Sequence, residues 1–307
     1  MHCRETLCRI QILQKVAKSA AKSAKANKLK AKTAQITEQL STRTRKNIEQ
    51  VREPGASSWL NVLPLENHHL NLNKSDFKDA LALRYDKHLN NLPSFCVCGS
   101  KFDVGHAMNC RRGGFINIRH NNIRDFETSL LSQVCNDVEK EPPLQPLTNE
   151  VLPRSANTSA EARLDIRARG FWRRGQSAYF DVRVTNADTA SQANLSVKSI
   201  LEKHEGEKKR AYNQRVIQVE QGTFTPLVFT AVGSMGPEAS SFHKTLAEKI
   251  ANKTGEKYSQ VINFIRCKLS SMAIRSALLC LRGSRGPVKQ ESTNGNDFAL
   301  YNHELSL

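Results

Sequence analysis

The sequence predicts an α/β domain in which a mixed β-sheet is flanked by helices. Three observations support this fold class: an amphipathic helical pattern, two neighbouring segments that alternate apolar and polar residues, and a strongly apolar segment set between helical ones. These patterns occupy, in chain order, residues 119–138, 162–172, 176–186 and 223–232. Helices and strands in this order are typical of a sheet covered by helices.

The first 55 residues form a basic arm. They contain thirteen Lys or Arg and four Asp or Glu, a net charge of +9. Ala and Lys dominate KVAKSAAKSAKANKLKAKTAQ, and both favour helix, but the stretch has few large apolar side chains to bury. We expect a helical or disordered arm that is either simply solvated or binds nucleic-acid phosphates. Residues 56–95 follow as a helical linker region.

The predicted α/β domain covers residues 119–283 and opens with a helix over 119–138. Its apolar residues recur at helical spacing and define one face. They are Ile123, Phe126, Leu130, Leu131 and Val134. The proline-bounded segment EPPLQPL, 141–147, is expected to be a loop or an edge strand.

Two strands joined by a turn at RRGQ come next. ARLDIRARGFW alternates its apolar residues with charged ones, and QSAYFDVRVTN alternates again. The remaining pattern predicts a helix over 196–221, the apolar strand over 223–232, helices over 238–252 and 258–283, and a flexible tail over 284–307.

The charge of the whole chain restricts the classes of partner. Its 46 Lys and Arg exceed its 29 Asp and Glu, which gives +17 and a pI near 9.7. Such an excess favours a polyanion, with nucleic acid first and an anionic membrane surface second. No apolar run reaches the roughly 18–20 residues that span a bilayer, and no secretory segment is recognised. We therefore expect an intracellular protein whose eight cysteines are reduced and serve as metal ligands or buried thiols.

The segment CVCGSKFDVGHAMNC, 96–110, contains three thiols and one imidazole. Cys96, Cys98, His106 and Cys110 are the ligand types of a tetrahedral structural zinc site. One residue separates the first two cysteines, where zinc sites usually have two. The alternative is a set of reduced cysteines on a loop with an incidental histidine. We expect a zinc knuckle over 96–118 that has a structural role, because four protein ligands leave no open position.

Each central strand carries one acid. Asp165 and Asp181 alternate with the apolar residues of their strands, so both point to the opposite face of the sheet. The turn expected between the two strands makes the acids neighbours. They are either polar residues on a solvated face or the two ligands of a Mg²⁺ ion. Arg183, two residues after Asp181, shares its face and would stabilise phosphate charge, although it cannot act as a base.

The helix predicted over 196–221 presents three polar residues on one face. His204, Lys208 and Tyr212 follow one another at i+4 spacing. Lys208 would supply the cation that the strand lacks. The alternative is an ordinary solvated basic face.

Taken together, these motifs resemble the C-terminal region of site-specific non-LTR retrotransposons. That region has a Cys-Cys-His-Cys knuckle followed by a restriction-like endonuclease of the PD-(D/E)xK superfamily. Arg163-Leu164-Asp165 resembles the first catalytic motif and Asp181 the second, while RHNNIRD is similar to the Arg-His-Asn segment after the knuckle. The resemblance spans about residues 80–283 and implies a restriction-endonuclease-like core.

The resemblance also implies roles for individual residues. Asp165 and Asp181 would hold Mg²⁺ for phosphodiester cleavage, with Glu127 preferred to Asp125 as a third acid. The residues expected to contact DNA are His120, Asn121, His204 and Tyr212. Two positions depart from the family: Leu164 replaces the motif proline, and Arg183 stands where many of these nucleases have lysine.

We therefore expect a retroelement-derived, Mg²⁺-dependent endodeoxyribonuclease of the nucleus. Its partner would be DNA, with RNA as the other candidate, and no small-molecule substrate or membrane is expected. No reverse-transcriptase domain is recognised, so the chain would be the tail of an element, a truncated gene product or a host-retained fragment. The alternative function is an inactive nucleic-acid-binding remnant of a retrotransposon polyprotein. A membrane-adhering basic protein is disfavoured, because the arm has few bulky apolar anchors.

Overall fold

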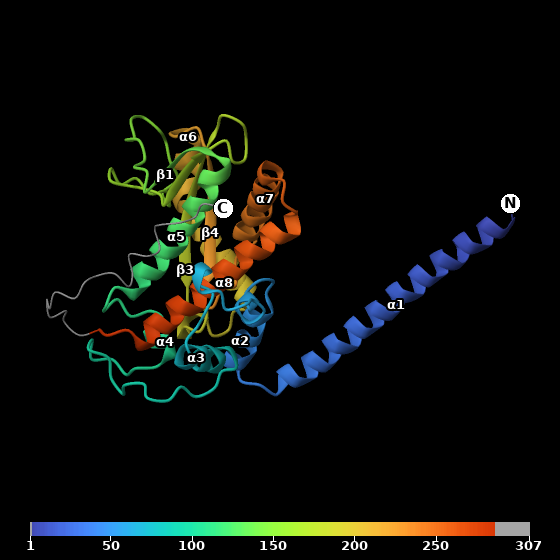
Figure 1. Cartoon of the computed structure of the whole chain (residues 1–307). Coiled ribbons are helices and arrows are strands. Elements are labelled where there is room, and N and C mark those ends of the chain that lie inside the picture. Colours follow the sequence, from blue (N-terminus) through green and yellow to red (C-terminus); the bar gives the residue numbers. More distant parts are fainter. Residues whose placement is uncertain (1, 286–307) are drawn as a thin grey trace. The chain divides into compact units, whose positions relative to one another are not determined.

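The computed structural model describes residues 2–285 (Figure 1). From residue 286 onward, the expected tail lies outside the described residues. The chain divides into two compact units, residues 1–45 and 46–307, so the division falls before the boundary at residue 55 that composition suggests. The elements are α1 (His2–Glu38), α2 (Thr42–Arg52), η1 (Ser58–Leu60), η2 (Glu66–His68), α3 (Lys74–Arg84), α4 (Val104–Ala107), α5 (Phe115–Val134), β1 (Asn136–Lys140), β2 (Ile166–Arg169), β3 (Ser177–Thr185), η3 (Ala190–Gln192), α6 (Val197–Gln218), β4 (Thr223–Thr230), α7 (Pro237–Thr254) and α8 (Tyr258–Arg282).

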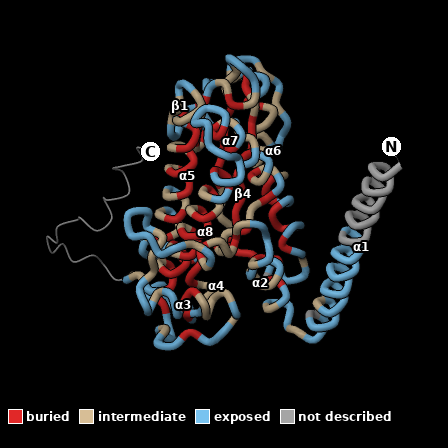
Figure 2. Tube along the Cα trace, turned by 45° about the vertical axis from the view of Figure 1, so that its right-hand side comes forward, coloured by how far each residue is buried: buried red, intermediate tan, exposed pale blue. Residues whose placement is uncertain are grey.

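The first unit consists mainly of the long helix α1. Over residues 19–36 its side chains are exposed, apart from the partly exposed Thr33 (Figure 2). The two larger apolar residues of this stretch, Leu29 and Ile36, are also exposed. The arm is thus helical, and the helix follows from the intrinsic preference of Ala and Lys.

The second unit contains a four-stranded mixed sheet in the order β1-β2-β3-β4. β1 pairs antiparallel with β2 and β2 antiparallel with β3, whereas β3 and β4 are parallel. The edge strand is β1, which ends at Lys140, directly before the segment 141–147 that is expected to be a loop or an edge strand. Pro142 and Pro143 account for the difference, because proline has no N–H to donate to a ladder.

Helices cover both faces of the sheet. The main core joins the apolar face of α5 to one face of β2, β3 and β4 and to α7 and α8 (Figure 2). On the other face, Tyr179 packs with Val216 of α6 and with Phe224, and Val228 packs with the start of α6. The prediction of a mixed α/β fold with flanking helices is confirmed. Among the described residues, no helix is long and apolar enough to span a membrane.

The Cys/His segment packs onto the C-terminal half of α8. Phe102, Ala107 and Met108 share a buried cluster with Ala277 and Leu281. The segment therefore does not depend on a metal alone, because it has an apolar core in common with a helix some 170 residues further along the chain.

Candidate metal centre and acidic site

A tight hairpin brings the first two cysteines together. Gly99 adopts a φ of 87°, a conformation that suits glycine, and its N–H donates to the carbonyl of Cys96 at 2.8 Å. The N–H of Cys96 donates to the carbonyl of Ser100 at 2.9 Å. Asp103 then caps the short helix α4 by accepting from the N–H of His106 at 2.7 Å. The hairpin and the capped turn place the imidazole opposite the thiols.

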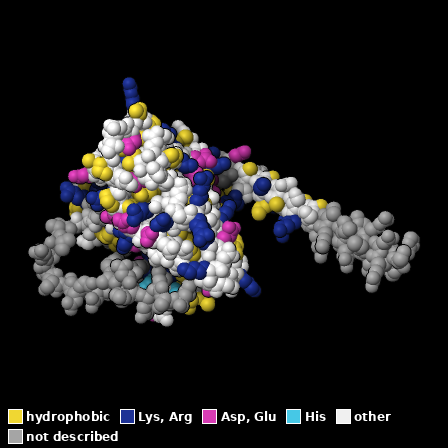
Figure 3. Space-filling model, turned by 90° about the horizontal axis from the view of Figure 1, so that it is seen from above, with side chains coloured by type: hydrophobic (Ala, Val, Ile, Leu, Met, Phe, Trp, Pro, Cys, Tyr) yellow, Lys and Arg dark blue, Asp and Glu magenta, His cyan; other side chains and the backbone are white. Residues whose placement is uncertain are grey.

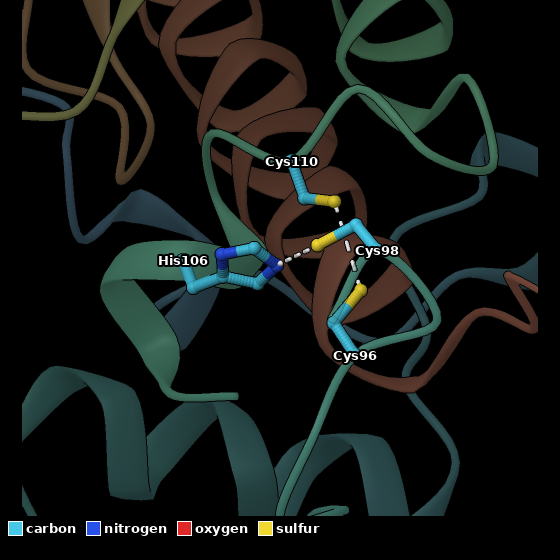
Figure 4. A group of neighbouring side chains, drawn as sticks. All are labelled: Cys96, Cys98, His106 and Cys110. Atoms are coloured by element: carbon cyan, nitrogen blue, oxygen red, sulfur yellow. Dashed lines mark hydrogen bonds between the residues drawn. The ribbon is translucent and has the colours of Figure 1, made fainter. Parts of the chain in front are cut away.

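The four side chains point toward one another, and their ligand atoms all lie within 4.8 Å (Figure 4). The Sγ atoms of Cys96 and Cys110 are 3.7 Å apart, and Sγ of Cys98 is 3.4 Å from Nε2 of His106. Zinc–ligand bonds of about 2.3 Å to sulfur and 2.0 Å to nitrogen give tetrahedral edges of about 3.8 and 3.6 Å. The cluster therefore matches the size of a zinc site and can hold a metal such as zinc.

The thiols differ in their electrostatic surroundings. The pKa of Cys98 is lowered to about 6, first by the backbone N–H of Ser100 and then by its hydroxyl. Burial raises the pKa of the Cys110 thiol. The six cysteines whose side chains the structure describes are all free. Cys98 is thus ready to act as a thiolate ligand near neutral pH.

Asp165 lies where β2 separates from β3. Ile166, the first residue of β2, pairs with Phe180 of β3. Directly before it in the chain, Oδ2 of Asp165 accepts from the N–H of Val182 at 2.6 Å. Nε2 of His120, on α5, is 3.2 Å from the same oxygen and 3.1 Å from the carbonyl of Val182. The two side chains thus satisfy backbone groups of β3 that β2 no longer reaches.

The contacts of His120 indicate that its Nε2 carries a proton, because both neighbouring oxygens are acceptors. Burial lowers the pKa of His120, but the hydrogen bond and the charge of Asp165 raise it more, so the net shift is upward. His120 is therefore a partly buried, readily protonated group that holds Asp165 in place.

Asp181 is buried beneath α6. Its neighbour across the sheet is Asp165, because the antiparallel register sets Ile166 opposite Phe180. Nζ of Lys208 lies 2.6 Å from Oδ2 of Asp181. Burial raises the pKa of Asp181 to about 6, Lys208 opposes the shift, and the charge of Asp165 adds to it. The interpretation of this strand face as solvated is wrong for Asp181, because α6 covers it.

His204 and Tyr212 of α6 also face the protein. Nδ1 of His204 is 3.0 Å from Oε2 of Glu207, and its Nε2 is 3.1 Å from Oγ1 of Thr185. Arg183 donates to the same Glu207 oxygen at 2.8 Å. The hydroxyl of Tyr212 accepts from Asn157, and Nζ of Lys208 lies 5.7 Å from its ring centre. This face of α6 is therefore a packed polar layer rather than a solvated basic surface.

The structure places Glu127 elsewhere. Its carboxylate is fully buried, and Oε1 is 2.8 Å from Nε2 of His243 on α7. The alternative acid, Asp125, pairs with Arg124 and Lys140. Asn121 lies beside His120, its Oδ1 3.3 Å from Nδ1. Within residues 2–285, the Cys/His cluster is the one group of three or more side chains with ligand atoms close enough to share a metal, so no third acid joins Asp165 and Asp181.

Sequence reasoning missed two residues of these networks. Glu207, which joins Arg183 to His204, follows His204 at i+3 and could have been found from that spacing. His243 directly follows the buried Phe242 on α7, but no local pattern connects it with Glu127, 116 residues earlier.

No family model matches the chain, and no curated protein sequence matches it.

Proposed function

We propose that this chain is a metal-dependent DNA endonuclease of the restriction-like type, related to the C-terminal region of site-specific non-LTR retrotransposons. One observation carries the proposal: Asp165, directly before β2, is the neighbour of Asp181 on β3, and the ammonium group of Lys208 lies beside Asp181. Two carboxylates and a lysine next to each other, where two central strands separate, suit the cleavage of a phosphodiester bond.

We propose that the two carboxylates would hold a Mg²⁺ ion, which proteins commonly bind with one or two carboxylates, substrate phosphate and water. In the described part of the chain, the side-chain contacts of Asp165 are made through Oδ2, so Oδ1 can serve as a ligand. When bound there, Mg²⁺ would supply an activated water and neutralise phosphate charge.

The protein's own groups would position the reactants. His120 and the N–H of Val182 fix the orientation of the Asp165 carboxylate. Lys208 holds Asp181 and adds positive charge for the phosphate, and Arg183, anchored by Glu207, adds more. Arg183 occupies the strand position where many of these nucleases have lysine, and Lys208 would supply the charge of that lysine from α6.

The Cys/His cluster and the basic arm would bind the nucleic acid. We propose a structural Zn²⁺ for the cluster, which would keep its hairpin and α4 in place against α8. Of the net charge of +17, the first 55 residues supply +9. On the face seen in Figure 3, Lys and Arg are interspersed with Asp and Glu. The uniform charge of the arm makes it the stronger candidate for phosphate contacts. DNA in the nucleus remains the proposed target, and RNA the other candidate.

A plasmid-nicking assay tests the proposal. The full chain is incubated with supercoiled DNA and Mg²⁺ or Mn²⁺, and Asp165→Asn and Asp181→Asn are each expected to lower the rate on the order of a hundredfold. The matched control is Asp137→Asn, which removes an exposed acid of β1 and should leave the rate unchanged. Equal nicking by all four proteins, or nicking that persists in excess chelator, would contradict the assignment.

The second candidate function is an inactive nucleic-acid-binding remnant. The observation in its favour is that both acids already have partners within the protein, Lys208 for Asp181 and Val182 with His120 for Asp165. The same assay, combined with a gel-shift measurement, separates the two. DNA binding without metal-dependent nicking identifies the remnant.

A further inference from the structure

A cavity of about 380 Å³ lies among α6, α7 and α8, beside the residues that follow α2. Its walls include apolar residues of all three helices, such as Leu201 and Ile262. Its lining also contains three cations, Lys198, Lys244 and Arg266, against the single acid Glu53. A small cavity with apolar walls and several cations suits an organic anion.

The cavity is also lined by His243, which is 2% exposed. Nε2 of His243 faces the fully buried Glu127, whereas Nδ1 has no hydrogen-bond partner among the described residues. Nδ1 is thus a buried polar atom of the cavity lining that the described part of the chain leaves without a hydrogen-bond partner, and a ligand in the cavity would supply one.

The cations at the cavity differ in their availability. Lys198 lies 3.7 Å from Glu202, in a surface ion pair. Among the side chains that the structure describes, no carboxylate lies within ion-pair distance of Lys244 or Arg266. An anion in the cavity would therefore meet two unengaged cations from α7 and α8 as well as the buried imidazole.

We propose that this cavity binds a small organic anion, one anionic oxygen group on an apolar body. The anionic group accepts from Nδ1–H of His243 and lies between Lys244 and Arg266, while the apolar body contacts Leu201 and Ile262. The Glu127–His243 pair is then a binding element, which gives Glu127 a role other than that of a third nuclease acid. A binding measurement alone tests this proposal, so the test does not depend on whether the chain cleaves DNA.

Octyl phosphate and octanoate are the probes, titrated into the full chain by calorimetry. Octan-1-ol, which lacks the charge, and inorganic phosphate, which lacks the apolar body, are the ligand controls. We expect one molecule of octyl phosphate or octanoate per chain and at least tenfold weaker binding of both controls. The preferred probe identifies the anionic group as phosphate or carboxylate. Equal binding of octan-1-ol, or no binding of either anion, would overturn the proposal.

Variants locate the site. Lys244→Gln removes an exposed cation and Arg266→Gln a partly exposed one, and each should weaken binding about tenfold, whereas Lys257→Gln, an exposed lysine outside the cavity, should not. In histidine-labelled protein, the Nδ1 resonance lost in His243→Gln should shift on titration of the wild type. If His243→Gln fails to fold, the two cation variants still decide. An unshifted resonance, or equal effects of Lys257→Gln and Lys244→Gln, would place the anion elsewhere.

Discussion

The Cys/His cluster and the acidic site are built in opposite ways. The cluster comes from fifteen consecutive residues, and a hairpin and one capped turn suffice to bring its ligands together. The acidic site draws on α5, β2, β3 and α6, from His120 to Lys208, and depends on how the helices cover the sheet. A local site can thus be predicted from spacing, whereas a distributed site can only be predicted as a set of candidates.

Loss of the proposed metal from the cluster should have the largest effect. Cys110→Ser should bind no zinc and lose on the order of 5 kcal/mol in free energy of unfolding, because metal binding and folding of the segment are coupled. Hydrogen exchange should increase not only over 96–110 but also around Ala277 and Leu281, which share its apolar core.

Metal content by mass spectrometry and urea unfolding measure these effects, with Cys135→Ser as the control thiol outside the cluster. If hydrogen exchange rises in the hairpin alone, the shared apolar core does not couple the cluster to α8.

Loss of the lysine at the acidic site should come next. Lys208→Met leaves Asp181 buried without its cation and should lower the free energy of unfolding by about 3 kcal/mol. The double variant with Asp181→Asn should recover most of this loss. Lys198→Met, which breaks an exposed ion pair with Glu202, should change it by less than about 1 kcal/mol. Equal losses in the two single variants would show that the Asp181 pair is not effectively buried.

Stability should also depend on pH through Asp181. The pKa of Asp181 is raised from 3.8 to about 6 in the folded chain, so between these values the folded state binds more protons than the unfolded state. Stability therefore falls as pH rises from about 4 to 6, on the order of 2 kcal/mol from this group. Urea unfolding at several pH values should show a shallower decline in Asp181→Asn. An identical decline would assign the dependence to other groups, such as Glu205, whose pKa is raised to about 7.

The smallest effect is expected at the helix that supports Asp165. His120→Gln can still donate one hydrogen bond but cannot carry the charge, so we expect a loss of about 1 kcal/mol in free energy of unfolding. Asn117→Gln, at an exposed position of α5, should be neutral. A larger effect at Asn117 than at His120 would contradict a positioning role for the imidazole.

The sequence predicted most of the elements, because the patterns of β3, β4, α5 and α8 are long and regular. It also indicated that Asp165, Asp181 and Lys208 belong together. It could not show that Asp181 is buried, since the alternation of β3 is the same whether α6 covers the other face or water does. Nor could it link Glu127 to His243, because helix packing sets that contact and both positions lie on apolar faces.

Helix α5 fixes the spacing between three separate sites. Phe115 belongs to the core of the Cys/His cluster, His120 holds Asp165, and Glu127 reaches the imidazole beside the cavity. These twelve steps span about 18 Å of helix, and each inserted residue would rotate everything beyond it by about 100°. Substitutions along α5 can therefore be tolerated one by one, but a change in its length cannot, and homologues should keep the interval from Phe115 to Glu127 constant even where the side chains differ.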